Sequence, residues 1–163
     1  MRHPMGTVIT EMVHYEQGEP HRVHHFLKVH AFARVIGESE GLSEREQEIL
    51  EVAAILHDVG IRESLRKYGS SAEPYQEKEG PPIARKMLEK LGYDEAFIDR
   101  VCYLVGHHHT YDAIDGKDYQ ILIEADFLVN ALESQMSRQD VEDVMKRIFK
   151  TAKGIAYLKT MYL

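Results

Sequence analysis

The chain has 163 residues, of which 44% are hydrophobic, 20 are Lys or Arg and 27 are Asp or Glu. This length and composition suit one globular domain and exclude a largely disordered chain. The formal charge of −7 disfavours non-specific binding to a nucleic-acid polymer, because an acidic surface repels a phosphate backbone. The single cysteine, Cys102, excludes an internal disulfide and a Cys-based zinc cluster.

The first helix is predicted by hydrophobic residues at helical spacing. In the segment 21–36, one stripe contains His25, Val29, Phe32 and Ile36. The N-terminal residues before it show no charged stretch followed by a long apolar one, so we expect no signal peptide. No apolar run reaches the roughly 20 residues that a membrane span needs. We therefore expect a cytoplasmic protein with no membrane partner.

A second helix follows a short connection. Ser43 and Glu46 have the spacing of a capping box, which predicts a helix start at this point. Its apolar positions continue to Leu56, and Gly60 ends it. The polar segment 62–80 predicts a short helix and then a long loop, and such loops inside compact domains are often functional.

Four more helices are predicted over residues 81–91, 94–104, 119–132 and 141–148. Pro81 and Pro82 suit the first turn of the first of these, and Asp94 suits the N-cap of the second. A polar turn precedes the helix at 119–132. The pattern contains no strand, repeat or linker, so it predicts an all-α, compact single-domain bundle of about six or seven helices over residues 1–163.

Ionisable residues interrupt three of the apolar helix faces. His57 and Asp58 follow an apolar run, Asp126 lies within another, and His25 shares the first stripe. Burial of such groups is costly unless they are paired or bound to a metal. One of them alone would be explained as a hydrogen-bonded core residue. Together they offer two imidazoles and two carboxylates, a set that suits Mn, Fe, Ni, Co or Zn.

These motifs resemble a known family. His25-x-x-Lys28-Val29, His57-Asp58-Val59-Gly60 and Ala125-Asp126 resemble, in this order, the H…HD…D signature of the HD superfamily of metal-dependent phosphohydrolases. The resemblance covers about residues 20–135 and implies an HD-domain-like fold. It implies a divalent transition metal held by four residues: His25, His57, Asp58 and Asp126. It also implies hydrolysis of a small phosphorylated substrate, with a nucleotide expected, by a metal-activated water that the catalytic Asp58 orients.

Binuclear members of the superfamily add histidines between the HD pair and the last Asp. The run His107-His108-His109 lies in that interval and is similar to a segment of HD-type cyclic-dinucleotide phosphodiesterases. Consecutive helical residues point about 100° apart, so at most two of them face one site. We predict His107 and His108. A third extra ligand matches Glu79, where relatives have His; Glu79 either binds a second metal or caps a helix start.

Other residues are candidates for binding the substrate. Arg62, four residues after Asp58, is the best candidate for binding the substrate phosphate. The weaker cationic candidates are Lys67, Lys78 and Arg85, and the aromatic residues that could stack on a base are Tyr68, Tyr75 and Tyr111. His21 lies one turn before His25 and could replace it as a ligand.

Two other functions fit the same residues. A di-iron oxygenase of the HD-like fold would use the extra His and Glu ligands. A non-catalytic nucleotide-binding sensor would need no metal. The segment 155–163 is apolar enough to dock on the chain's own core or on a second copy, which leaves a homo-oligomer open.

Overall fold

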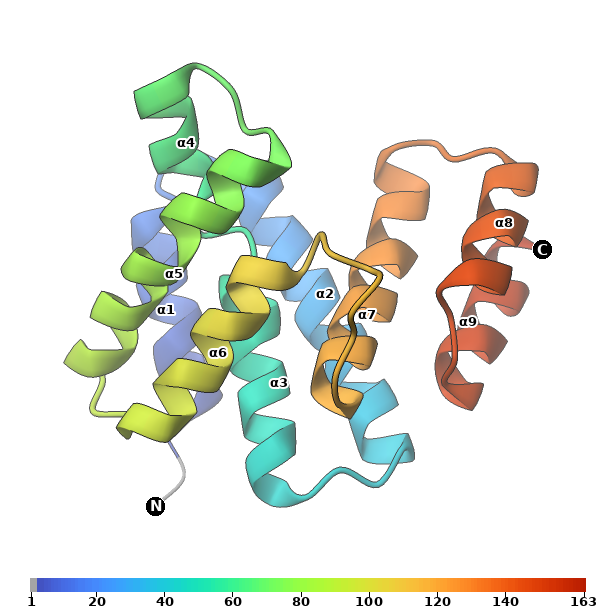
Figure 1. Ribbon diagram of the computed structural model, residues 1–163, viewed down its shortest axis with the longest axis horizontal. Coiled ribbons are helices and arrows are strands. Elements are labelled where there is room, and N and C mark those ends of the chain that lie inside the picture. The colour runs from blue at the N-terminus through green and yellow to red at the C-terminus, as the bar shows by residue number, and fades with distance from the viewer. Residues whose placement is uncertain (1–2) are drawn as a thin grey trace.

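The computed structural model describes residues 3–163, which form nine α-helices and no strand. The helices are α1 (Met5–Tyr15), α2 (Pro20–Ser39), α3 (Glu44–Leu56), α4 (Ile61–Tyr68), α5 (Glu73–Lys90), α6 (Glu95–His107), α7 (Lys117–Glu133), α8 (Arg138–Arg147) and α9 (Ala152–Tyr162). Figure 1 shows α2, α3 and α7 in the middle of the bundle, α5 and α6 on one side, and α8 with α9 at the other end. The prediction of an all-α bundle is confirmed. In the described chain, no helix combines the length and apolarity that crossing a membrane requires.

The helix count exceeds the predicted six or seven because the bundle has short helices at both ends. Helix α1 buries Val8 and Met12 and packs against α3, and α9 buries Gly154 and Leu158. Two buried positions make a weak periodic pattern. Packing against the central helices, rather than local sequence, decides that these segments are helical.

Helix α5 begins two turns earlier than predicted. We expected the helix to start at Pro81, because a proline inside a helix removes a backbone donor and crowds the preceding turn. The structure instead places Pro81 and Pro82 inside α5, which starts at Glu73 and packs along α6. The predicted long loop therefore shrinks to residues 69–72 between α4 and α5.

A close backbone contact fixes the turn between α3 and α4. A Cβ added to Gly60 would lie 2.7 Å from the carbonyl oxygen of Gln76 and 2.8 Å from the amide nitrogen of Gly80, both in α5. Only a glycine allows this approach. The turn that carries His57 and Asp58 therefore rests directly on the α5 backbone.

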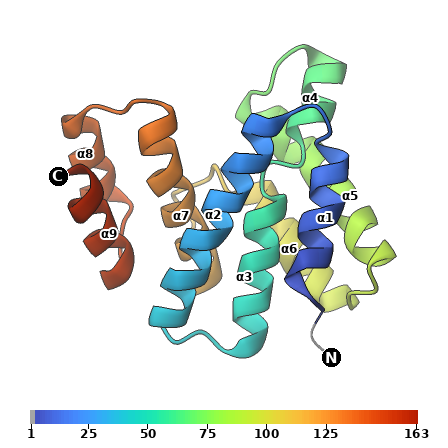
Figure 2. The same cartoon turned by 180° about the vertical axis from the view of Figure 1, so that it is seen from behind.

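A buried carboxylate joins the C-terminal helix pair to α7. Figure 2 shows α8 and α9 beside α7 from behind. Glu124 of α7 is fully buried and accepts hydrogen bonds from the amides of Lys150 (2.9 Å) and Thr151 (3.1 Å) and from the Thr151 hydroxyl (2.6 Å). The Gln120 side chain donates to it as well, at 2.6 Å. Because Thr151 is the N-cap of α9, Glu124 determines where that helix starts.

Candidate metal centre

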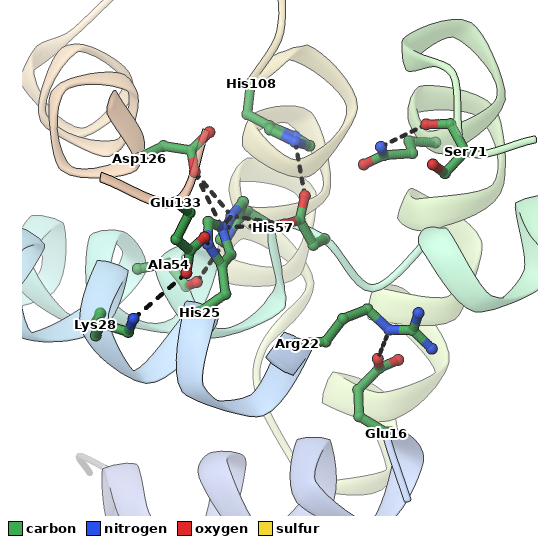
Figure 3. Close-up of polar contacts among 12 residues, drawn as sticks. Glu16, Arg22, His25, Lys28, Ala54, His57, Ser71, His108, Asp126 and Glu133 are labelled. Carbon is green, nitrogen blue, oxygen red and sulfur yellow. Dashed lines mark hydrogen bonds and ion pairs between the residues drawn. The ribbon is translucent and has the colours of Figure 1, made fainter. Parts of the chain in front are cut away.

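Four ionisable side chains from three parts of the bundle converge in its interior (Figure 3). His25 comes from α2, His57 and Asp58 follow the end of α3, and Asp126 comes from α7. The Nε2 atoms of His25 and His57 lie 3.1 Å apart. Asp58 Oδ2 is 3.2 Å from both Nε2 atoms, and Asp126 Oδ1 is 3.2 and 3.3 Å from them. The structure thus brings together the four residues of the predicted set.

The outer nitrogen of each imidazole has an acceptor, which determines the tautomer. His57 Nδ1 lies 2.7 Å from the carbonyl oxygen of Ala54, and His25 Nδ1 lies 2.7 Å from a carboxylate oxygen of Glu133. An acceptor at Nδ1 requires the proton there, so in the neutral ring Nε2 carries a lone pair. Both lone pairs face the two aspartates, as in histidines that bind a metal.

The charges at this cluster favour a bound cation. Burial disfavours the charged form of His25, but Asp126 and Asp58 outweigh burial and raise its pKa to about 10. Burial likewise opposes the charge on His57, and the same carboxylates still raise its pKa. Protons on both Nε2 atoms would point at each other across 3.1 Å. One metal ion among the four side chains would balance the carboxylates without that conflict.

The donor atoms also have the spacing that a transition metal requires. Ligand atoms bound at about 2.1 Å stand about 3 Å apart on neighbouring positions of the metal, and the contacts of the two Nε2 atoms here measure 3.1 to 3.3 Å. Within the described residues, Asp126 Oδ1 is buried and makes no hydrogen bond. His25, His57 and Asp58 therefore form a group that fits a divalent metal, and Asp126 lies beside both imidazoles of that group.

A second group of possible ligands shares Asp58. Its members are Asp58, His108 and His109, each with one ligand atom within 4.8 Å of the others. His108 Nδ1 lies 2.8 Å from the carbonyl oxygen of Val105, and its Nε2 is 3.4 Å from Asp58 Oδ1. The Nε2 atoms of His108 and His109 are buried and have no hydrogen-bond partner in the described chain. Burial, together with the neighbouring His108, lowers the pKa of His109 to about 4, which keeps the His109 ring neutral at neutral pH.

The prediction that His107 faces this site has to be corrected. His107 is the last residue of α6; its ring stacks on Tyr103 at 4.0 Å, and its Nδ1 lies 2.7 Å from the Tyr103 carbonyl oxygen. The chain turns after α6, so His108 and His109 are not spaced as on a continuous helix. The structure therefore brings His108 and His109, rather than His107 and His108, to Asp58.

Glu79 lies away from both groups of possible ligands in the described chain and away from a helix start. It lies inside α5, so it does not cap a helix start. Its carboxylate accepts hydrogen bonds from Lys67 (2.8 Å) and Tyr68 (2.9 Å) of α4, and these bonds lower its pKa. It belongs to neither of the two ligand groups of the described chain. Tyr68 also stacks on Tyr75, with ring centroids 4.2 Å apart.

The other predicted residues lie around these groups. Arg62 donates to the carbonyl oxygen of Gln17 at 2.8 Å, which ties α4 to the turn between α1 and α2. Tyr111 packs against Phe127, the residue after Asp126, with centroids 5.5 Å apart. His21 is exposed on α2 and is in neither group, and Arg85 pairs with acidic residues of α6.

Sequence reasoning missed a residue that holds the turn with His108 and His109. The hydroxyl of Tyr119, a fully buried residue of α7, lies 2.8 Å from the carbonyl oxygen of His107 and 2.5 Å from that of Thr110. A tyrosine at an apolar helix position carries no signal of this role, because its hydroxyl partners lie nine and twelve residues away in sequence.

We expect Tyr119→Phe to loosen this turn without breaking the core. The substitution keeps the ring and removes the Tyr119 hydroxyl from these two carbonyls, so the free energy of unfolding should fall by about 1–2 kcal/mol. Urea unfolding measures this loss, and the amides of residues 108–112 should exchange hydrogen faster. Tyr157→Phe on α9 is a matched control with an unchanged turn; equal exchange in both variants would contradict the assignment.

The fold and the cluster define an all-α protein with buried His and Asp residues of the metal-ligand type. The HD domain family model matches residues 22–152, so the chain belongs to the HD domain family. HD domains bind divalent metals, which agrees with the two groups of possible ligands in the described chain: His25, His57 and Asp58, and Asp58, His108 and His109.

A solved structure has the same fold. It is the crystal structure of a predicted HD superfamily hydrolase from an uncultured Thermotogales bacterium, and it aligns with a TM-score of 0.66 and 20% sequence identity. The alignment covers 97% of this chain and 83% of that one. Comparison with curated proteins gives no match.

Proposed function

We propose that this protein is a metal-dependent phosphohydrolase acting on a small phosphorylated substrate, with a nucleotide as the proposed substrate class. The observation that carries the proposal is the convergence of two imidazole Nε2 atoms and two carboxylates within 3.1 to 3.3 Å contacts. In this proposal, a first metal is held by His25, His57, Asp58 and Asp126. A second would use Asp58, His108 and His109.

A bound divalent metal supplies a Lewis acid that acidifies a water molecule and polarises a phosphoryl oxygen. The protein's own residues do the rest. His57 is sealed from solvent, whereas the Asp58 side chain is 21% exposed. Substrate therefore reaches the cluster from the side of Asp58. An Asp58 oxygen at this opening can accept a hydrogen bond from the attacking water and so orient it, which is the catalytic role proposed for this residue.

Substrate binding in an acidic protein depends on local contacts. The net charge of −7 repels a phosphorylated molecule at long range, so the metal ions and a few cations must attract it. Arg62 is the proposed phosphate-binding residue because it lies in the first turn of α4, four residues after Asp58. Tyr111, beside Phe127 on the Asp126 side, is the proposed aromatic contact for a base.

A panel of nucleotides and simple phosphate esters tests this function. We expect hydrolysis that requires Mn²⁺, Co²⁺, Ni²⁺ or Fe²⁺ and stops on chelation. His57→Ala should reduce kcat/KM by a factor on the order of 100 or more, because it removes a buried ligand. His24→Ala, an exposed histidine beside His25, is the matched control. Metal-independent hydrolysis, or full activity in a folded His57→Ala variant, would contradict the proposal.

A further inference from the structure

A carboxylate outside the predicted ligand set contacts His25 at Nδ1, the ring nitrogen that points away from the cluster. Glu133, the last residue of α7, accepts the Nδ1 proton of His25 at 2.7 Å. The two residues are 108 positions apart in sequence. Figure 3 shows Glu133 between His25 and Lys28, and Lys28 Nζ lies 3.5 Å from the second carboxylate oxygen.

His25 differs from the other inward imidazoles in this contact. His57 and His108 place Nδ1 against the backbone carbonyls of Ala54 and Val105, each three residues earlier in the same segment. Of these three described imidazoles, only His25 has a charged side chain as the partner of its Nδ1 atom. A carboxylate at Nδ1 fixes the ring orientation and makes Nε2 a stronger electron-pair donor.

The position of Glu133 in its helix does not explain the contact. A negative charge at a helix C-terminus is unfavourable because the helix dipole is negative there. Glu133 lies seven residues after Asp126, so both project from nearly the same face of α7. One helix face thus provides a candidate ligand, Asp126, and the acceptor that orients another ligand.

We propose that Glu133 is a positioning residue of this metal centre: it fixes the Nδ1–H tautomer of His25 and thereby strengthens cation binding at His25 Nε2. The proposal rests on the metal centre of the proposed function. It adds a residue outside the cluster of His25, His57, Asp58 and Asp126, and it places the control of metal affinity at the C-terminal end of α7.

Metal affinity tests the proposal directly. Binding of Mn²⁺ is measured by competition with a chelating dye for the wild type, Glu133→Gln and Glu133→Ala. We expect affinity about 10- to 100-fold weaker in Glu133→Ala. The Mn²⁺ affinity of Glu133→Gln should lie between those of the wild type and Glu133→Ala, because the amide oxygen of Gln accepts the same proton but carries no charge. The visible absorption of the Co²⁺-loaded protein should shift in both variants, since the His25 donor changes.

The matched control is Glu38→Ala. Glu38 also lies in the last turn of a helix and pairs with a cation, Arg34, at 3.2 Å, but it contacts no histidine. This control should bind Mn²⁺ like the wild type. The unfolding temperature of the metal-free protein should change little in the Glu133 variants, because the lost hydrogen bond is offset by removal of a charge that opposes the α7 dipole.

Three outcomes would overturn the proposal. Wild-type affinity with an unchanged Co²⁺ spectrum in both Glu133 variants would remove the role of Glu133 and leave the metal centre in place. A large drop in the unfolding temperature of the metal-free protein, accompanying weaker binding, would make Glu133 a structural residue. A wild-type protein that takes up no Mn²⁺ or Co²⁺ would overturn the proposed function together with this inference.

Discussion

Asp58→Asn is expected to abolish both metal uptake and hydrolysis, with kcat/KM falling by on the order of a thousandfold or more. Asp58 is the residue that the two ligand groups share: its Oδ2 is 3.2 Å from the Nε2 atoms of His25 and His57, and its Oδ1 is 3.4 Å from His108 Nε2. Asparagine keeps the shape but removes the charge that balances a cation. Metal content after dialysis and kcat/KM on a substrate from the panel measure the two losses.

The control for Asp58→Asn is Asp99→Asn. Asp99 is an exposed aspartate of α6 that pairs with Arg85, away from the cluster. The Asp99→Asn variant should retain bound metal and activity at wild-type levels. If Asp58→Asn kept both metal and turnover, the shared carboxylate would not be the centre of the site, and the mechanism would have to be rebuilt on other residues.

Glu124→Ala is expected to cost about 3 kcal/mol or more of the free energy of unfolding. The change removes an acceptor from two backbone amides, a hydroxyl and a side-chain amide in a fully buried position. Each buried donor left without a partner costs about 1–3 kcal/mol. Urea unfolding gives the loss, and hydrogen exchange should show the α9 amides opening first, because Glu124 holds the start of that helix.

Glu142→Ala is the control for this stability effect. Glu142 is a glutamate of α8 that forms a surface pair with Arg138 at 3.6 Å, and such pairs contribute roughly 0–1 kcal/mol. The stability loss of Glu124→Gln should lie between those of Glu124→Ala and Glu142→Ala, since the amide oxygen of Gln still accepts hydrogen bonds. A loss below 1 kcal/mol in Glu124→Ala would mean that other contacts hold α8 and α9.

The main cluster could be predicted because its signal is local. His25 and Asp126 interrupt apolar helix faces, and His57 and Asp58 directly follow an apolar run; an ionisable group at such a place needs a physical reason. The capping box at Ser43 is equally local, and the structure has both of its hydrogen bonds. Helix-forming patterns of this kind depend on residues within one or two turns.

Contacts between segments that are distant in sequence determine the positions of the remaining site residues, and local patterns do not predict such contacts. The orientation of His108 and His109 depends on where α6 ends and on the Tyr119 hydroxyl from α7. From the sequence, Glu79 was a candidate metal ligand or helix cap. In the structure it accepts hydrogen bonds from Lys67 and Tyr68 of α4, and no local pattern indicates these partners. No pattern around Glu133 indicates that it meets an imidazole from α2.

The amino-acid sequence by itself determined that this chain forms an all-α domain and which four ionisable side chains form the main cluster inside it. Periodicity and the cost of burying charge act within one helix, so they can be read along the chain. Only the tertiary structure decided which side chains complete and orient the site. These partners, Glu133 and Tyr119 among them, meet their targets through the packing of helices that are far apart in sequence.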